Sequence, residues 1–108
     1  MLRIYPVVLE LVANLRPVLR ELERQDADLA RQCRRALTSV PLNIAEGSCG
    51  FGRNRVMRYH TALGSLREVL ACLEVGVALG YLGEIEPGMM RLFDQVLGTL
   101  VSLVRKRA

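Results

Sequence analysis

The spacing of hydrophobic residues is that of α-helices along the whole chain. Between residues 2 and 24 the apolar side chains recur every three or four positions with polar ones between them, as on one face of an amphipathic helix. Pro17 falls inside this repeat and has no N–H to donate to the carbonyl of Ala13. Because the apolar repeat continues on the same side beyond it, we expect this helix to be kinked at Pro17.

A second helix is predicted from Leu29 to Gly47. It follows a short polar connection in which either Asp26 or Asp28 can cap its free backbone amides. The apolar positions form a narrow stripe, and Leu42 lies apart from them on the polar side, either as a contact with another subunit or as a singly exposed leucine. Pro41 lies within this helix, and we expect a bend there because its ring crowds the preceding turn.

Two further helices are predicted after a glycine-rich turn at residues 47–52. The third begins with Asn54 as its N-cap and extends to Gly80. One side of it carries small residues seven positions apart, which would let a neighbouring helix approach closely: Gly64, Ala71 and Ala78. The fourth begins at Pro87, and apolar residues cover about half of its circumference, so it should be buried on two sides.

Four amphipathic helices with short connections predict one all-α domain over residues 1–108, an up-down-up-down antiparallel four-helix bundle. A hydrophobic content of 51% is high for so small a domain and indicates that some apolar surface faces another subunit. No apolar run approaches the ~20 residues that span a bilayer, and the first residues lack the layout of a signal peptide. We therefore expect a cytoplasmic protein without membrane contact.

The three cysteines do not predict a disulfide framework, because their number is odd and no C-x-x-C pair is present. Cys33 and Cys72 fit small residues packed between helices. Cys49, in the glycine-rich turn, is a candidate for an exposed and reactive thiol.

Positive charge is concentrated in the middle of the chain. The net charge is +4, and residues 29–58 hold six arginines but only one acid. Guanidinium groups favour bidentate contact with phosphate or carboxylate, and nucleic-acid binding needs several cations presented together. The candidate nucleic-acid-binding residues are Arg31, Arg34, Arg35, Arg53, Arg55, Arg58, Arg105, Lys106 and Arg107. The alternative is a solvated basic face with internal salt bridges, and we see no interleaved aromatic residues of the kind used for single-strand stacking.

A second candidate is a polar set on the second and third helices. Its members are Arg35, Ser39, Asn43, Glu46, Ser65 and Glu68. Because the glutamates lie beside arginines, we interpret the set as a structural network between helices or subunits, with a ligand site as the alternative. The single histidine, His60, has no glutamate three residues before it, so the Glu-x-x-His pairs of a di-iron centre are missing and we predict no metal or cofactor.

Several segments resemble those of a known family. They are Arg34-Arg35-Ala36, the run Ser39-Val40-Pro41-Leu42-Asn43-Ile44-Ala45-Glu46-Gly47, Gly64-Ser65-Leu66-Arg67-Glu68 and Leu79-Gly80-Tyr81-Leu82. In this order they are similar to the four-helix-bundle proteins encoded in intervening sequences of bacterial 23S ribosomal RNA genes. The resemblance implies a four-helix bundle and a homo-oligomer, but no reaction, because the biochemical function of that family is not established.

That family is in turn similar in fold to the accessory variability proteins of diversity-generating retroelements. Those proteins form basic pentameric barrels that bind nucleic acid and a reverse transcriptase. The likeness implies a pentamer, but this chain lacks the glycine-glycine-tryptophan ending of those proteins and contains no tryptophan. Their role therefore applies here as an analogy between folds.

The sequence leads to two hypotheses for function. The first is a non-enzymatic, oligomeric nucleic-acid-associated protein that binds RNA or DNA, with RNA favoured. The second is a protein-binding scaffold or adaptor whose charges serve solubility and assembly. An enzyme comes third and would require a bound metal or ligand in a polar pocket near Glu46 and Glu68.

Overall fold

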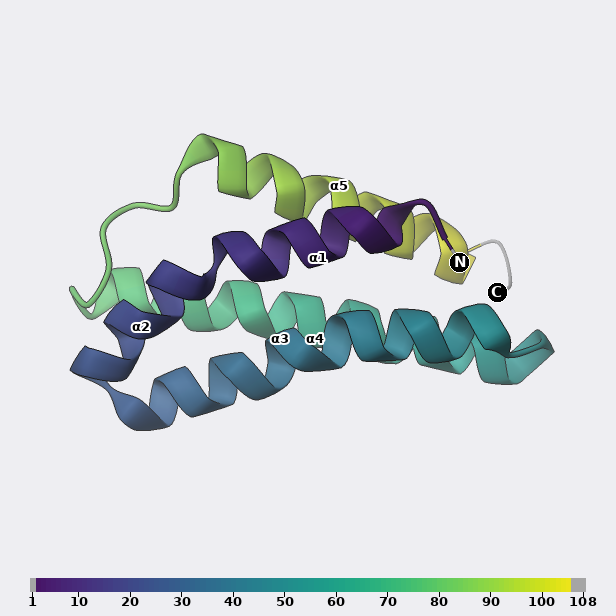
Figure 1. Cartoon of the computed structure of the whole chain (residues 1–108), viewed down its shortest axis with the longest axis horizontal. Coiled ribbons are helices and arrows are strands. Elements are labelled where there is room, and N and C mark those ends of the chain that lie inside the picture. Colours follow the sequence, from purple (N-terminus) through teal and green to yellow (C-terminus); the bar gives the residue numbers. More distant parts are fainter. Residues whose placement is uncertain (1, 106–108) are drawn as a thin grey trace.

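The computed structural model describes residues 2–105, which form five helices in an antiparallel bundle (Figure 1). The helices in chain order are α1 (Ile4–Asn14), α2 (Arg16–Gln25), α3 (Ala27–Cys49), α4 (Gly52–Ala78) and α5 (Pro87–Arg105). Figure 1 shows α1 and α2 running in one direction, α3 running back, and α4 and α5 repeating this alternation. The predicted all-α bundle is confirmed, with its first helix in two parts.

The break in the first helix lies at Leu15. Its N–H donates both to the carbonyl of Leu11 at 3.0 Å and to that of Val12 at 3.3 Å, which tightens the last turn of α1. Pro17 lies in the first turn of α2, where a missing N–H leaves no helical bond unmade. Leu15 and Leu19 are both buried and extend the apolar stripe across the break. The interruption expected at Pro17 is thus present, as a division between two helices.

Asp26 alone connects α2 to α3. Its Oδ1 accepts a hydrogen bond from the N–H of Leu29 at 3.0 Å, so it is the cap of α3, and Asp28 lies in the first turn. An ion pair of 3.3 Å between Glu23 of α2 and Arg34 of α3 spans the same corner. Of the two aspartates predicted as caps, Asp26 therefore takes this role.

The predicted end of the second helix at Gly47 is wrong, because α3 continues to Cys49 and passes without interruption through the buried Pro41. Gly47 is buried within the helix and faces Tyr59 of α4. A Cβ atom added at Gly47 would lie 2.5 Å from Cε1 of Tyr59. Glycine is required here for the close approach of two helices and does not end one.

The predicted start of the third helix is also wrong. Only Gly50 and Phe51 separate α3 from α4, and Gly52, the first residue of α4, has a φ of 56° that favours glycine. Phe51 occupies the N-cap position and makes no side-chain cap bond. Asn54, predicted as the cap, lies in the first turn of the helix.

The core combines one face of every helix. Tyr59, Leu66 and Leu73 of α4 are buried against the other helices, and α5 packs against both α1 and α4, as its wide apolar face predicted. Small residues permit close contact at Gly76, where an added Cβ would lie 2.9 Å from Leu82 Cδ1. None of the helices within residues 2–105 has the length and apolar character needed to cross a membrane.

The predicted small-residue side of the third helix has a different environment from Gly76. Gly64, Ala71 and Ala78 are all exposed, and a Cβ added at Gly64 would meet nothing within 4 Å. The close helix approach expected there does not occur within residues 2–105. Leu42 is likewise exposed, as expected both for a contact with another subunit and for a singly exposed leucine.

Candidate nucleic-acid interface

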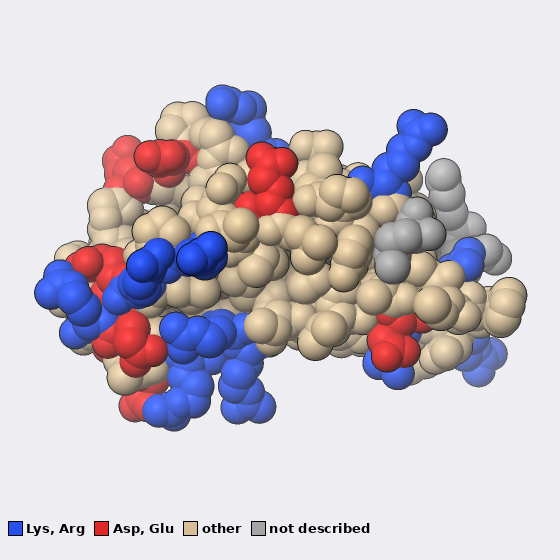
Figure 2. Space-filling view, viewed as in Figure 1, with Lys and Arg blue, Asp and Glu red and all other residues tan. Residues whose placement is uncertain are grey.

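One group of arginines lies at the end of the bundle where α2 meets α3. Figure 2 shows basic side chains gathered over α2 and the first part of α3. We call this group the corner cluster, and its exposed members are Arg16, Arg20 and Arg24 of α2 with Arg31, Arg34 and Arg35 of α3. Sequence reasoning identified the three on α3 and missed the three on α2.

Half of the corner cluster is ion-paired, and every pair is exposed. Arg24 Nη2 lies 2.7 Å from Glu21 Oε2 and lowers the pKa of that carboxyl group by donating hydrogen bonds to it. Arg31 pairs with Asp28 at 3.2 Å, and Arg34 pairs with Glu23 at 3.3 Å. Ion pairs as exposed as these contribute little to stability, so these guanidinium groups can exchange carboxylate for phosphate at little cost.

The other half of the corner cluster makes no ion pair within residues 2–105. It consists of Arg16, Arg20 and Arg35, all of them exposed. A guanidinium group without a carboxylate partner has all of its donors available to water or to an anionic ligand. The corner cluster therefore has unneutralised positive charge on two adjacent helices.

A second group of arginines lies at the opposite end of α3, at the beginning of α4. We call residues 50–58 the hairpin tip, and its arginines are Arg53, Arg55 and Arg58. Arg55 Nε donates to the carbonyl of Gly47 at 3.2 Å, and Arg58 Nη1 donates to Asn43 Oδ1 at 3.3 Å. At ~1.5 Å of rise per helical residue, Arg31 lies about 27 Å from Cys49, the last residue of α3. The two groups of arginines therefore form separate surfaces.

Of the three basic residues predicted near the end of the chain, Arg105 is the one that the structure describes. Arg105 is exposed at the last turn of α5. Lys106 and Arg107 lie outside the described residues. The seven described candidates are thus divided between the corner cluster, the hairpin tip and the end of α5, and one chain does not bring these seven together on one continuous patch.

Hydrogen bonds connect three side chains of the predicted polar set. Ser39 Oγ and Ser65 Oγ lie 2.8 Å apart across α3 and α4. Asn43 Nδ2 donates to the carbonyl oxygen of Ser39 at 2.9 Å and to its Oγ at 3.0 Å. All three residues are half-buried and satisfied by these bonds, and Arg58 joins them through Asn43. The arrangement suits the joining of two helices.

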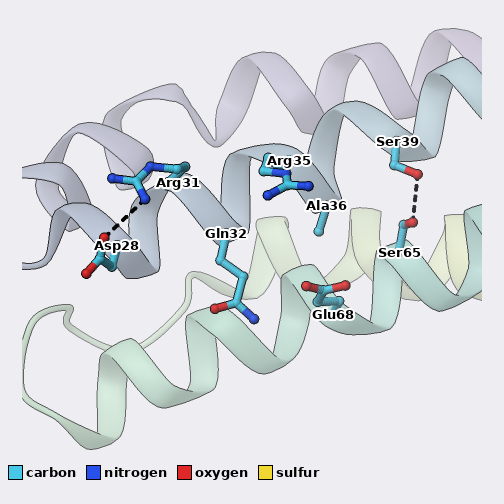
Figure 3. Close-up of a pocket in the computed structure, with 8 residues that line it drawn as sticks. All are labelled: Asp28, Arg31, Gln32, Arg35, Ala36, Ser39, Ser65 and Glu68. Atoms are coloured by element: carbon cyan, nitrogen blue, oxygen red, sulfur yellow. Dashed lines mark hydrogen bonds and ion pairs between the residues drawn. The ribbon is translucent and has the colours of Figure 1, made fainter.

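The remaining members of that set lie outside the hydrogen-bonded part. Arg35 and Glu68 line an open groove of about 630 Å³ between α3 and α4, and Figure 3 shows them on the two sides of this groove with Gln32 between the helices. Glu46 is exposed, and it forms no ion pair within residues 2–105. No group of three or more His, Cys, Asp or Glu side chains suited to a metal ion occurs among these residues.

The thiols differ in accessibility. Cys33 of α3 and Cys72 of α4 are buried next to each other, and burial raises the pKa of Cys33 to about 12 and also raises that of Cys72. Such thiols stay protonated and unreactive near neutral pH. Cys49, at the end of α3, is exposed.

Phe51 is the second feature that sequence reasoning missed. Its side chain is 86% exposed at the hairpin tip, close in sequence to three arginines. From the sequence alone we did not recognise it as an aromatic residue beside basic ones. The signal was present in the sequence, since a large apolar residue between Gly50 and Gly52 in a short connection has little opportunity to reach the core. For the arginines of α2 the signal was their spacing of four residues, which places them along one side of a helix.

Comparison with known proteins gives one family and one solved structure. The model of the 23S rRNA-intervening sequence protein family matches residues 1–100. A crystal structure of a protein with unknown function from the S23 ribosomal protein family of Bacteroides thetaiotaomicron has 18% sequence identity and a TM-score of 0.78, and the match covers 94% of this chain and 97% of that one. A search of curated proteins found no match. At this identity the solved structure supports the fold, and neither comparison indicates an enzyme. Since the family model spans nearly the whole sequence, the chain belongs to the 23S rRNA-intervening sequence protein family.

Proposed function

We propose that this protein is a non-enzymatic, RNA-associated protein that acts as a homo-oligomer. The corner cluster is the observation that supports this most strongly, because Arg16, Arg20 and Arg35 are exposed and form no ion pair within residues 2–105. Phosphate groups of a nucleic acid match guanidinium donors in geometry and charge. Each phosphate neutralised releases counterions, so affinity grows with the number of cations presented.

RNA is favoured over DNA by the family to which the chain belongs, whose name refers to intervening sequences of 23S ribosomal RNA. Binding to RNA in the cell would also agree with the cytoplasmic location expected from the sequence, which stays a prediction. Charge supports binding to a nucleic acid, and this family relation supports RNA in particular.

Self-association is supported by an unusual exposed side of α4. Exposed residues recur there at alternating intervals of four and three, the spacing of a helix-packing seam. We call these residues the α4 seam, and they are Met57, Thr61, Gly64, Glu68, Ala71, Val75 and Ala78. Glu68 is the one charged member. Glu68 also lines the open groove beside α3, and every residue of the α4 seam is exposed, so the seam is free to contact a second copy.

The number of copies stays a prediction. The resemblance described above implies five, and a pentamer would repeat the corner cluster five times around one axis. A ring of this kind would offset the small size of the basic surface on one chain, because the phosphates of one RNA molecule could be neutralised by several subunits together.

The proposal is tested by fluorescence anisotropy with a labelled RNA over a range of salt concentrations. Replacing Arg16, Arg20 and Arg35 with alanine should weaken binding and reduce the slope of log K against log salt by about 2, since each lost phosphate contact on a single strand accounts for about 0.7. The matched control replaces Arg3, Arg67 and Arg91, three exposed arginines elsewhere on the surface, and should retain the slope of the wild type. An absence of binding to RNA and DNA at low ionic strength would refute the proposal.

The scaffold hypothesis has one specific observation in its favour, since the α4 seam would also accept a helix of a different protein. It predicts that a pull-down after nuclease treatment recovers one protein partner. Substitution of Ala71 by glutamate should then abolish that recovery, because a charge would be placed in the middle of the contact.

A further inference from the structure

Within residues 2–105, the most exposed large apolar side chain is that of Phe51, at the hairpin tip. Its 86% exposure leaves nearly the whole aromatic ring in water. The backbone causes this: Phe51 lies in the two-residue connection between α3 and α4, has an extended conformation, and precedes Gly52 with its positive φ. The ring therefore projects from the end of the bundle and does not reach the core.

Three arginines follow this ring closely in the sequence. Arg53, Arg55 and Arg58 lie within the first two turns of α4, and the acid nearest to Phe51 in sequence is Glu46 of α3. The bonds of Arg55 to the Gly47 carbonyl and of Arg58 to Asn43 hold two of the guanidinium groups in place. Arg53 is exposed and makes no ion pair within residues 2–105.

The base of the hairpin tip is well packed, so the exposed ring stands on a firm support. Tyr59 is only 3% exposed and lies directly against Gly47, and Arg55 adds a hydrogen bond across the same contact between α3 and α4. A site held in this way loses less conformational freedom when a ligand binds than one on a long loop would.

An unpaired nucleotide has the chemistry that fits these observations. Its base presents a flat face that can stack on the Phe51 ring, and its phosphate carries the charge that Arg53 can neutralise. Stacking of a base on an aromatic side chain contributes about 1–3 kcal/mol, independently of base identity. In a duplex the base faces are covered by their neighbours, so a duplex could engage the arginines and leave the ring unused.

We propose that Phe51 and Arg53 form a binding site for an unpaired nucleotide of a single-stranded or looped RNA. This inference rests on the proposed function and refines it by assigning a different contact with RNA to each of two surfaces. The corner cluster contacts phosphates of any RNA, whereas the hairpin tip discriminates unpaired from paired nucleotides.

The absence of tryptophan from the sequence makes a direct test possible, because Phe51→Trp introduces a single fluorescent reporter at the tip. We expect a 12-nucleotide single-stranded RNA to quench its emission through stacking, and a blunt duplex of the same length to quench it much less. The control is Leu9→Trp, a reporter on α1 at a position that is 45% exposed and outside both arginine groups. Its emission should be insensitive to either RNA.

Affinity provides the second measurement. Phe51→Ala and Phe51→Leu should each weaken binding of the single strand about 5- to 150-fold and leave binding of the duplex within a factor of two. The leucine variant keeps an apolar side chain and removes the aromatic face, so an equal loss in both variants identifies stacking. Arg53→Ala should also weaken binding of the single strand, and it should reduce the slope of log K against log salt by about 0.7.

The outcomes separate this inference from the proposed function. Salt-sensitive RNA binding without quenching at Phe51→Trp and without loss at Phe51→Ala would refute the inference and leave the proposed function intact. An absence of any RNA binding would refute both the inference and the proposed function. A blue shift of the Phe51→Trp emission with rising protein concentration and no RNA would identify the ring as a contact between copies, and would also refute the inference.

Discussion

The ring of Tyr59 on α4 fills the space beside Gly47 on α3, where an added Cβ would lie 2.5 Å from Cε1 and 2.9 Å from Cδ1. Glycine inside a helix is less favourable than alanine by roughly 0.5–1 kcal/mol, because it has more freedom to lose on folding. The two helices gain the burial of an aromatic side chain in return, since Tyr59 is 3% exposed. This contact explains how α3 continues through a residue that usually ends helices.

Gly47→Ala should lower the free energy of unfolding by about 1–3 kcal/mol, because the buried ring of Tyr59 has to move to admit a methyl group. Denaturant unfolding followed by circular dichroism measures this change. The control is Gly98→Ala on α5, where an added Cβ meets nothing within 4 Å and helix propensity should raise stability by about 0.5–1 kcal/mol. Equal stability of Gly47→Ala and wild type would show that the helices can separate there without cost.

The hydroxyl pair of Ser39 and Ser65 should contribute a measurable coupling between α3 and α4. Each single alanine substitution is expected to cost about 0.5–1.5 kcal/mol, and a double-mutant cycle should give a coupling of about 0.5–1 kcal/mol because the two oxygens lie 2.8 Å apart. Ser102→Ala, at an exposed position of α5, should change stability by less than about 0.5 kcal/mol. Strict additivity of the two substitutions would mean that water replaces this bond equally well.

Stability should fall in alkaline solution because of Cys33. Burial raises the pKa of its thiol from 9.0 to about 12, so the unfolded chain releases this proton at a lower pH than the folded one. The neutral thiol thus favours folding fully below pH 9, and this contribution is lost as the pH rises toward 12, by up to about 1.4 kcal/mol for each pH unit. Unfolding curves between pH 8 and 11 test this, with Cys33→Ala expected to show a shallower decline. An identical pH profile for Cys33→Ala and wild type would be inconsistent with the burial of this group.

The α4 seam should control assembly. If copies meet there, light scattering of the wild type gives a mass above the 12.1 kDa of one chain, and Ala71→Glu shifts it toward the monomer because a charge enters the contact. Ser102→Glu adds the same charge at an exposed position of α5 and should leave the mass unchanged. A monomeric wild type at micromolar concentration would exclude self-association through this surface.

Much of the fold was predictable because burial of one face determines which positions along a helix are apolar. This rule located the helices and the burial of α5 on two sides, and the missing N–H of Pro17 indicated the interruption of the first helix. The ends of helices were harder to predict. Gly47 has the sequence signature of a helix end, but its position in α3 depends on the Tyr59 ring, which only the folded hairpin brings to it.

The surface was less predictable than the core. Counting charges along the sequence drew attention to residues 29–58 and away from α2, whose arginines are offset by nearby acids. In the folded protein Arg16 and Arg20 make no ion pair within the described residues, so the count understated the charge that α2 offers. The helix predicted from Leu29 to Gly47 already separates Arg31 from Arg53, but the sequence analysis grouped the two as one candidate surface.

The pairing of α1 with α5 brings together the first and last helices of the described chain, whereas α3 and α4 are joined by only Gly50 and Phe51. Closing a short connection costs little entropy, and joining segments that are separated by most of the chain costs more. During folding we therefore expect the α3–α4 hairpin to form early and the two terminal helices to dock last. Native-state hydrogen exchange should accordingly find the slowest amides in α3 and α4, with α1 opening first.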